Sequence, residues 1–357
     1  MAAACPGPVV YALEFAGEDD AFAAREAAAA ATAVDVVAPG LATARGVDRE
    51  RARTLAFTRT ASDLLARTDA DVAAARAVLE TAAFGREGTV AVRARDVRGT
   101  TGVDTRAAER ELGAVLVDRG FEVDLDDPDY VLRAFFSRGE SDRSDADGTV
   151  ADGTDAAGTC LLGWQAVEAV RDFAARAPTD KPFFQPGSMD PALARALANV
   201  AGAGPGATVL DPMCGTGGGL IEAGLVGADV LGVDAQRKMV RGAAENFAQY
   251  LDGEGPLGAT GDWHFLRGDA TRLPLPDRSV DAAVFDVPYG RQSRIEASDE
   301  GGLVGGALVE ARRVAPRGVV VADRSLASAA EDAGWTVEEV FERRVHRSLV
   351  RYVHVLA

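Results

Sequence analysis

Lysine is almost absent from this chain of 357 residues. Only Lys181 and Lys238 stand among its 38 basic residues, against 55 acidic ones, and the formal net charge is -17. A surface of this kind repels itself at low salt, and molar salt screens the repulsion. We therefore expect a halophilic protein, with a merely acidic protein from a high-GC genome as the alternative.

Cysteine and histidine are also scarce, which argues against two kinds of stabilisation. Cys5, Cys160 and Cys214 form no CxxC pair, and the three histidines lack the spacing of zinc ligands. We expect neither a disulfide framework nor a structural zinc site, and no metal at the functional site.

Long apolar runs and targeting signals are missing as well. No apolar stretch reaches the roughly 20 residues that span a membrane, and the N-terminal residues do not resemble a signal peptide. We expect a cytoplasmic protein without a membrane partner. At 357 residues and 47% hydrophobic content, two or three globular domains are expected.

The first half of the chain has an α+β pattern. "VVYALEF" (9–15) predicts a strand, and an Ala-rich helix is expected over 19–34. "TLAFTRTASDLLA" (54–66) predicts a strand that leads into a helix. "GTVAVRARDV" (88–97) alternates as a half-buried strand does, and residues 105–120 predict an amphipathic helix before further strands.

Two segments connect this half to the second. Residues 137–159 are rich in Asp, Gly, Ser and Thr, which predicts a disordered acidic loop. Residues 166–178 predict a helix. From Pro178 onward strands and helices alternate, and this indicates a parallel sheet.

A glycine-rich turn, "ATVLDPMCGTGGGLIEAGL" (207–225), predicts a cofactor site. In dinucleotide-binding proteins the glycines follow the strand directly, whereas Asp211 comes first here. This carboxylate would repel a pyrophosphate, but it would accept hydrogen bonds from an ammonium group. S-adenosylmethionine (SAM) carries such a group and no phosphate, so the turn favours SAM and argues against a dehydrogenase.

Further acids follow later strands in the same order. Asp234 is placed to bind ribose hydroxyls, and Asp269 to accept from the adenine amine. The alternative is that Asp211 and Asp234 only cap helices. The residues expected to contact SAM are Asp211, Cys214, Gly215, Thr216, Gly217, Asp234, Ala235, Asp269, Ala270 and Asp286. Of these, Cys214 is expected to fill space rather than to act as a nucleophile.

The stretch "FDVPYG" (285–290) predicts the catalytic residues. Asp286 ends a buried strand, Pro288 fixes the chain direction beside the substrate, and Tyr289 is placed to stack on a flat ring. A carboxylate beside an aromatic platform suits a base that bears an exocyclic amine. The alternative for Tyr289 is a core tyrosine at the sheet edge.

With these motifs the chain resembles the archaeal and eukaryotic tRNA guanosine-10 N2-methyltransferases. The matching stretches are "KPFFQPGSMDPALARALANVA" (181–201), "LDPMCGTGG" (210–218), "DVPYGRQS" (286–293) and "RSLVRYVHVL" (347–356). The first is distinctive of this family, whereas D-x-P-Y is shared by many amino-directed methylases. Val287 replaces the first proline of the usual D-P-P-Y. It keeps the backbone carbonyl but loses the fixed φ.

The resemblance implies an α/β class I Rossmann-like methyltransferase domain over 181–357, with a mostly parallel sheet and an antiparallel C-terminal hairpin. An α+β ferredoxin-like part (1–50) and a THUMP RNA-binding domain (51–165) are expected before it, joined by a linker helix at 166–180. It also implies SAM-dependent methylation of the N2 amine of guanosine 10 in tRNA, once or twice, with Asp286 and Tyr289 as catalytic residues.

Several alternatives stay open at this point. One is another methylation target: guanosine 6 of tRNA, guanine N2 of rRNA, or adenine N6. Another is a catalytically inactive RNA-binding protein. A small activator subunit is a further candidate partner beside tRNA. RNA phosphates attract arginine, and the candidate contacts are Arg93, Arg95, Arg98, Arg347 and Arg351. The alternative is that both arginine clusters are solvated faces.

Overall fold

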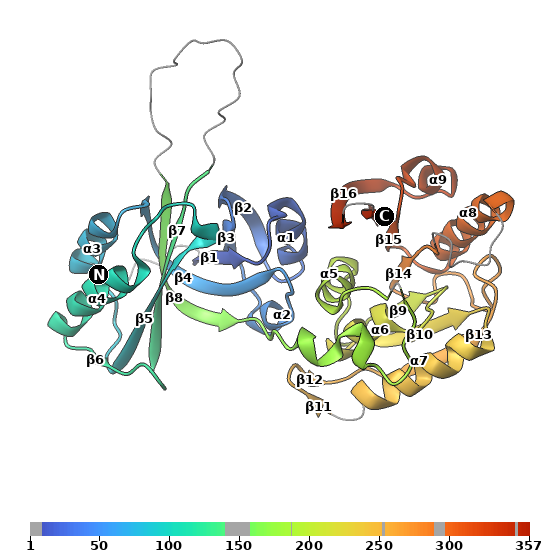
Figure 1. Cartoon of the computed structure of the whole chain (residues 1–357), viewed down its shortest axis with the longest axis horizontal. Helices are drawn as coiled ribbons and strands as arrows, with labels where there is room; N and C mark the ends of the chain where they lie inside the picture. Colours follow the sequence, from blue (N-terminus) through green and yellow to red (C-terminus); the bar gives the residue numbers. More distant parts are fainter. Residues whose placement is uncertain (1–8, 140–157, 187, 252–253, 289–296, 347–348) are drawn as a thin grey trace, which may run out of the picture. The chain divides into compact units, whose positions relative to one another are not determined.

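The computed structural model of the chain divides into two compact units, Met1–Ala169 and Val170–Ala357 (Figure 1). The structure describes residues 9–139, 158–186, 188–251, 254–288, 297–346 and 349–357. Apart from its two ends, the predicted acidic loop lies outside the described residues.

The N-terminal unit is built on one mixed sheet in the order β2-β3-β1-β4-β8-β7-β5-β6. Neighbours are antiparallel from β2 to β7, whereas β5 runs parallel to β7 and β6. Its elements are β1 (Val10–Phe15), α1 (Asp20–Ala27), β2 (Thr32–Ala38), β3 (Leu41–Arg45), α2 (Arg49–Arg53), β4 (Thr58–Asp69), α3 (Val72–Thr81), β5 (Thr89–Asp96), η1 (Val97–Gly99), α4 (Thr105–Asp118), β6 (Glu122–Val123), β7 (Tyr130–Ser137) and β8 (Thr159–Glu168).

The long strands β4 and β8 hold the two halves of this sheet together. Their pairing extends along β4 from Thr60 to Asp69. In one half, Leu13 and Phe15 belong to a buried cluster that includes residues of α1 and β3. In the other, residues of α3 and α4 are buried with β5, β7 and Trp164. The unit is therefore the expected α+β layer, with helices covering an extended sheet.

Two predicted helices of this unit are wrong in extent. Residues 58–69 form one strand, and the helix that follows it, α3, begins only at Val72, because β1 and β8 bond to the two edges of the strand and override the helix propensity of the sequence. The Ala-rich helix ends at Ala27, since the chain enters β2 at Thr32. The strands predicted near 9–15 and 88–97 and the helix predicted near 105–120 are confirmed.

The segment predicted as a linker helix contains no α-helix. Strand β8 continues to Glu168, and two 3-10 turns follow, η2 (Phe173–Arg176) and η3 (Pro178–Asp180). Pro178 has no backbone N–H and disfavours helical φ/ψ in the residue before it. A continuous helix through this segment is therefore blocked.

The C-terminal unit is built on a sheet in the order β13-β10-β9-β14-β15-β17-β16. The pairs from β13 to β15 are parallel, and β17 and β16 add an antiparallel hairpin. This confirms the predicted fold class. The elements are α5 (Pro191–Ala201), β9 (Thr208–Asp211), α6 (Gly218–Leu225), β10 (Asp229–Asp234), α7 (Arg237–Tyr250), β11 (Glu254–Gly255), β12 (Gly258–Ala259), β13 (Trp263–Arg267), β14 (Ala282–Asp286), α8 (Ala297–Val314), β15 (Gly318–Ala322), α9 (Ala327–Asp332), β16 (Val337–His346) and β17 (Leu349–Leu356).

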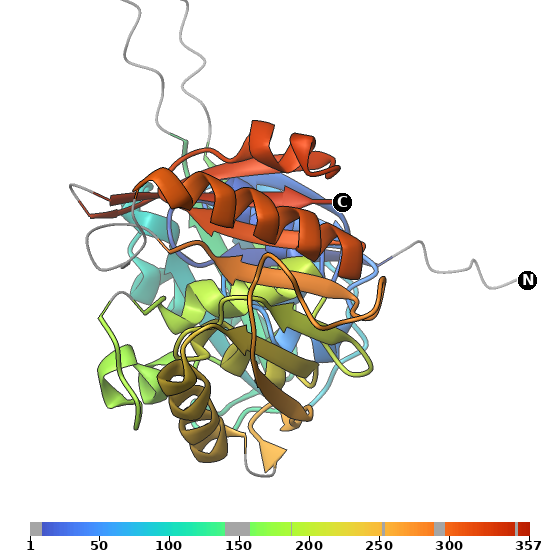
Figure 2. The ribbon, with the colours of Figure 1, turned by 90° about the vertical axis from the view of Figure 1, so that its right-hand side faces the viewer.

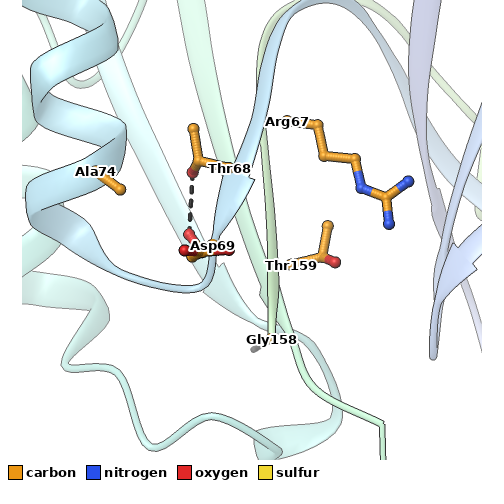
Figure 3. A pocket seen from close by; sticks show the side chains of 6 residues that line it. All are labelled: Arg67, Thr68, Asp69, Ala74, Gly158 and Thr159. Atoms are coloured by element: carbon orange, nitrogen blue, oxygen red, sulfur yellow. Dashed lines mark hydrogen bonds between the residues drawn. The ribbon is translucent and has the colours of Figure 1, made fainter. Parts of the chain in front are cut away.

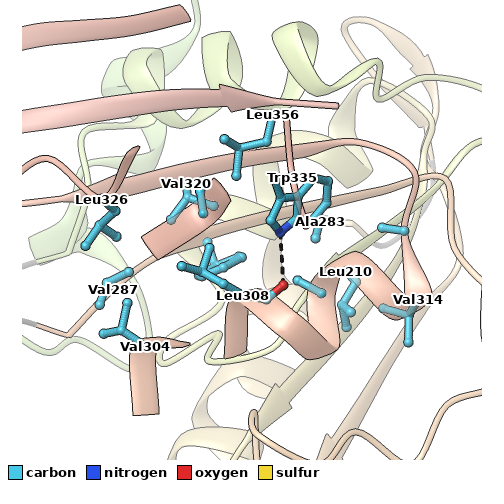
Figure 4. Packing of buried hydrophobic residues seen from close by; sticks show 14 of the residues in the cluster. Leu210, Ala283, Val287, Val304, Leu308, Val314, Val320, Leu326, Trp335 and Leu356 are labelled. Atoms are coloured by element: carbon cyan, nitrogen blue, oxygen red, sulfur yellow. Dashed lines mark hydrogen bonds between the residues drawn. The ribbon is translucent and has the colours of Figure 1, made fainter. Parts of the chain in front are cut away.

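One apolar cluster fixes the central strands of this unit (Figure 4). Leu210 of β9 and Val320 of β15 are completely buried in it with Leu308 of α8. Trp335 donates its indole N–H to the backbone carbonyl of Leu308 over 2.9 Å. In Figure 2, which looks onto this unit, the orange helix α8 runs in front of the strands. This core holds in place the carboxyl ends of β9 and β14.

Candidate active site

Three aspartates lie at the carboxyl ends of adjacent parallel strands. Asp211 ends β9, Asp234 ends β10 and Asp286 ends β14, and β9 lies between the other two strands. Asp211 is 7% and Asp234 9% exposed, and the Asp286 side chain is 25% exposed. Open α/β sheets bind ligands in the crevice outside these ends, so the sequence prediction of an acidic crevice here is consistent with the fold.

The electrostatics of Asp211 show how concentrated this negative charge is. Burial, first of all, raises the pKa of the Asp211 carboxyl well above its usual range. A hydrogen bond of 2.9 Å from the backbone N–H of Met213 opposes this, and the charges of Asp234 and Asp286 add to it. A cationic group bound in the crevice would relieve the repulsion.

The glycine-rich turn after β9 has a conformation that needs glycine. Gly215 has a φ of +53° and Gly217 a φ of +76°, which is the left-handed region that side chains rarely adopt. A Cβ on Gly217 would lie 2.9 Å from the ring of Phe247 and 3.2 Å from Ala243. The turn therefore packs its backbone directly on α7, and larger residues would displace it.

Asp234 holds this turn as well as lining the crevice. Its Oδ2 accepts from the backbone N–H of Gly215 over 3.0 Å, and its Oδ1 from that of Gln236 over 2.8 Å. Burial raises the pKa of the Asp234 carboxyl, and these two hydrogen bonds oppose the rise. The neighbouring Ala235 is exposed. The carboxylate therefore has a structural contact to the turn that the sequence did not reveal.

Cys214 and Thr216 lie inside the turn. Burial raises the pKa of the Cys214 thiol well above its usual range, so it is protonated at neutral pH and a poor nucleophile. The sulfur lies 3.0 Å from where a Cβ on Gly232 would be. Thr216 is buried at 8% exposure. This environment suits the space-filling role expected for Cys214.

A residue that the sequence did not single out connects the turn to an earlier segment. Asn246 of α7 is completely buried. Its Oδ1 accepts from the backbone N–H of Phe183, while its Nδ2 donates to the carbonyls of Phe183 and Thr216. The ring of Phe183 packs so closely on Gly242 that a Cβ there would lie 1.9 Å from it. Asn246 thus ties the segment at 181–185 to the glycine turn.

Asp269 and Ala270 lie after β13, the strand next to β10. Asp269 is exposed, and its Oδ1 accepts from both the backbone N–H and the hydroxyl of Thr271. These bonds lower the pKa of the Asp269 carboxyl. Ala270 is buried at 6% exposure. Both stand at the same edge of the sheet as Asp211, Asp234 and Asp286.

Arg351 lies beside Asp286, which differs from its predicted place among RNA-contacting arginines. Its side chain on β17 is only 7% exposed, and its Nη2 lies 3.6 Å from Asp286 Oδ2. A guanidinium this deeply buried has little surface to offer a phosphate, because the fold places it toward the catalytic candidate. The sequence could not separate an inward from an outward arginine on this strand.

The residues after Asp286 accommodate the missing proline. Val287 donates its backbone N–H to the carbonyl of Val321 over 2.8 Å, a bond that proline cannot make. Its side chain is 3% exposed in the cluster of Figure 4. Pro288 is half-buried. Tyr289 and Arg347 lie outside the described residues.

The three N-terminal arginines predicted to bind RNA all make contacts within their own unit. Arg93 donates to the carbonyl of Leu125 over 2.7 Å, and Arg95 Nε lies 3.0 Å from the buried Glu14. Arg98 forms an ion pair of 2.5 Å with Asp20. Arg98 therefore ties the end of β5 to the start of α1, which argues for a structural role.

A hollow of about 530 Å³ borders the ends of β4 and β8 in the N-terminal unit (Figure 3). Its lining residues are Arg67, Thr68, Asp69, Ala74, Gly158 and Thr159. The Thr68 hydroxyl donates to the Asp69 carbonyl over 3.0 Å. This lining lacks the converging buried acids of the strand-end crevice, so we do not assign the active site to it.

The described part of the chain contains no group of three or more His, Cys, Asp or Glu side chains that could hold a metal ion. No described helix is long and apolar enough to cross a membrane.

Comparisons with known proteins identify relatives of the chain. Residues 178–353 match a family described as an RMKL-like methyltransferase domain. A tRNA (guanine(10)-N2)-dimethyltransferase of Methanothermobacter thermautotrophicus is 35% identical over 271 residues, which cover 74% of this chain and 72% of the relative. A protein of the same name from Pyrococcus abyssi is 29% identical over 276 residues, 76% of this chain and 74% of the relative.

Among solved structures, TrmN from Thermus thermophilus matches 97% of this chain and 99% of its own, with a TM-score of 0.49 and 22% identity.

Proposed function

Because the chain belongs to the tRNA (guanine(10)-N2)-dimethyltransferase family, we propose that it transfers methyl groups from SAM to the N2 amine of guanosine 10 in tRNA. The observation that carries the proposal is the crevice of Asp211, Asp234 and Asp286 at the ends of three adjacent parallel strands. Each of these acids has a separate task there.

The crevice fits SAM in charge. Three carboxylates converge on it, and the pKa of Asp211 is raised partly because the other two repel it. SAM carries an ammonium and a sulfonium, and it supplies an electrophilic methyl group when bound. Asp211 accepts from the ammonium, Asp234 from the ribose hydroxyls and Asp269 from the adenine amine. The turn at 214–217, with Ala235 and Ala270 beside it, supplies the close backbone contacts.

Asp286 acts on the nucleophile. The lone pair of guanine N2 is delocalised into the ring, so the amine is a poor nucleophile in the plane of the base. Asp286 accepts a hydrogen bond from its N–H, which favours pyramidal geometry and stabilises the positive charge that develops on nitrogen. Arg351 attracts the Asp286 carboxylate from 3.6 Å and so fixes its direction. No strong base is needed, because the alkylated amine is acidic and loses its proton readily.

The base is held by the residues that follow. Pro288 directs the chain past the substrate, and we propose that Tyr289 stacks on the flipped guanine. Holding N2 close to the methyl donor then contributes through proximity and orientation.

We further propose that tRNA is bound by the N-terminal unit, with residues 51–165 acting as a THUMP domain, and that the enzyme works in the cytoplasm. Arg93 and Arg95 of β5 are electrostatically coupled to Arg133 of β7. Arg93 and Arg95 are the best candidates for phosphate contact on this acidic protein. Arg95 pairs with Glu14, but its side chain is 48% exposed. Arg98 is left out because its side chain pairs with Asp20 and is only 23% exposed.

The test is methylation of defined tRNA transcripts followed by nucleoside mass mapping. The purified protein with SAM should form N2-methylguanosine and N2,N2-dimethylguanosine at position 10, and replacing guanosine 10 with adenosine should abolish incorporation. A methyl group found at guanosine 6 or on adenine N6 would overturn the proposed target. Transcripts left unmodified, with SAM bound normally, would indicate the need for an activator subunit.

A further inference from the structure

Lys181, one of only two lysines in the chain, is buried beside the cofactor turn. It is 6% exposed, and it precedes the segment whose Phe183 backbone is held by two hydrogen bonds with Asn246. Its Nζ lies 2.9 Å from where a Cβ on Gly218 would be. Gly218 is the first residue of α6, so the ammonium sits at the N-terminal end of that helix.

The N-terminal end of α6 is suited to an anion. Gly217 caps this eight-residue helix in the left-handed conformation, and it has no side chain that could accept from the first backbone N–H groups. These N–H groups and the helix dipole favour negative charge at this point. Among the described residues, no carboxylate lies within ion-pair distance of Lys181 Nζ.

The charges packed around Lys181 do not balance. Glu222 Oε1 lies 2.7 Å from Arg176 Nε, and its Oε2 lies 2.6 Å from Arg195 Nη2. Arg176 also pairs with Asp172 over 2.7 Å. Two acids therefore face three cations, Arg176, Arg195 and Lys181, and one positive charge remains. Burial lowers the pKa of the Lys181 ammonium; the charge of Glu222 opposes this and that of Arg176 adds to it. An additional anion beside the ammonium would therefore stabilise its charged form.

We propose that Lys181, with the start of α6, binds the carboxylate of the methionine portion of SAM. The inference rests on the proposed function and adds a residue to it. Asp211 takes the ammonium at one end of the glycine turn, and Lys181 takes the carboxylate at the other end. The zwitterionic amino acid group of SAM is thereby bound by one acidic residue, Asp211, and one basic residue, Lys181. The protein thus distinguishes SAM from adenosine derivatives that lack the carboxylate.

The first test compares two ligands by calorimetry. S-adenosylhomocysteine (SAH) has the carboxylate, and its decarboxylated analogue keeps the ammonium and the nucleoside. The wild type should bind SAH at least ten times more tightly than the analogue. Lys181→Met should lose most of this preference by weakening SAH alone, whereas Lys181→Arg should keep part of it. Lys238→Arg, at the only other lysine, is the matched control: it keeps a cation over the Phe183 ring, which Lys238 Nζ approaches to 5.5 Å, and should bind both ligands as the wild type does.

Each result has a distinct meaning. Equal weakening of both ligands in Lys181→Met would make the lysine a packing residue and overturn the inference, as would an unchanged preference. A wild type that binds neither ligand would instead overturn the proposed cofactor. Circular dichroism of each variant separates loss of folding from loss of binding.

A second test needs no variant at position 181. Protein labelled with 13C-lysine gives signals from two lysines only, and Lys238→Met assigns them. The Lys181 Cε signal should shift on addition of SAH and stay in place with the decarboxylated analogue. Identical shifts with both ligands would contradict the assignment even if Lys181→Met fails to fold.

Discussion

Glu14 in the N-terminal sheet and Asp211 in the crevice are both almost completely buried, at 2% and 7% exposure, and burial raises the pKa of both carboxyls. Around Glu14 the charges of Arg95, Arg59 and Arg133 oppose the rise. Around Asp211 one backbone N–H opposes it, while two further acids increase it. The first acid is compensated by the protein, and the second is left for a cationic ligand to compensate.

The largest effect is expected at the catalytic acid of the crevice. Asp286→Ala should lower the methylation rate by about 10²–10³-fold, the usual effect of removing one group that stabilises transition-state charge. SAH affinity should stay within a few-fold, because the carboxylate acts on the substrate amine. Single-turnover methylation and calorimetry measure the two quantities. Asp281→Asn, just before the opposite end of β14, is the control, and near wild-type turnover in Asp286→Ala would exclude the mechanism.

A smaller effect is expected on binding at Asp234. Asp234→Ala should weaken SAH binding by about 1.5–3 kcal/mol for each charged hydrogen bond lost. The loss includes order in the turn, since Gly215 and Gln236 lose their acceptor. Calorimetry with SAH gives the change. Asp229→Ala, at the other end of the same strand, should leave affinity unaltered. An unchanged dissociation constant in Asp234→Ala would reduce this carboxylate to a cap.

The comparison of the two buried acids can be tested by making each one neutral. Without cofactor, Asp211→Asn should increase the unfolding free energy at neutral pH by about 1 kcal/mol, a typical single-site effect. Glu14→Gln should raise the unfolding free energy clearly less, because this variant also loses the attraction between the carboxylate and three arginines. Urea unfolding at several pH values measures both.

The pH dependence of this gain follows from the raised pKa of Asp211. Above the folded-state pKa the cost of the buried charge is fully present, so the asparagine variant has its full advantage there. As pH falls toward the ordinary pKa of Asp, Asp211 of the wild type becomes neutral in the unfolded state as well as in the folded state. The stability advantage of the asparagine variant then disappears. An advantage that grows on acidification, or equal gains at both sites, would contradict the comparison.

The smallest effect concerns exposed charges, which salt screens much more strongly than it screens buried ones. With 55 acidic against 38 basic residues, tRNA methylation should rise a few-fold from low salt toward molar KCl, since screening weakens long-range repulsion of RNA. The stability difference between Asp211→Asn and the wild type should change little over the same series. Circular dichroism separates folding from binding. Full folding with maximal activity at about 0.1 M salt would argue against a halophilic protein.

The sequence predicted the parts of the fold that depend on local patterns. The acids at strand ends and the glycine turn were identified because residue order alone carries the signal. The extent of β4 was missed because its pairing with β1 and β8 is non-local. The positions of Arg351 and Asn246 were missed for a related reason. Whether a polar side chain on a strand or helix points inward depends on tertiary packing, and composition does not record it.

The three hydrogen bonds of Asn246 also limit where this chain can be shortened. A fragment that starts at Asp190, the N-cap of α5, would contain every strand of the seven-stranded sheet. It would nevertheless lack Phe183, so Asn246 would keep only its bond to Thr216 and the ring that covers Gly242 would be gone. Because Asp172 also binds Arg176, which pairs with Glu222 of α6, we expect the smallest independent cofactor-binding fragment to include Asp172.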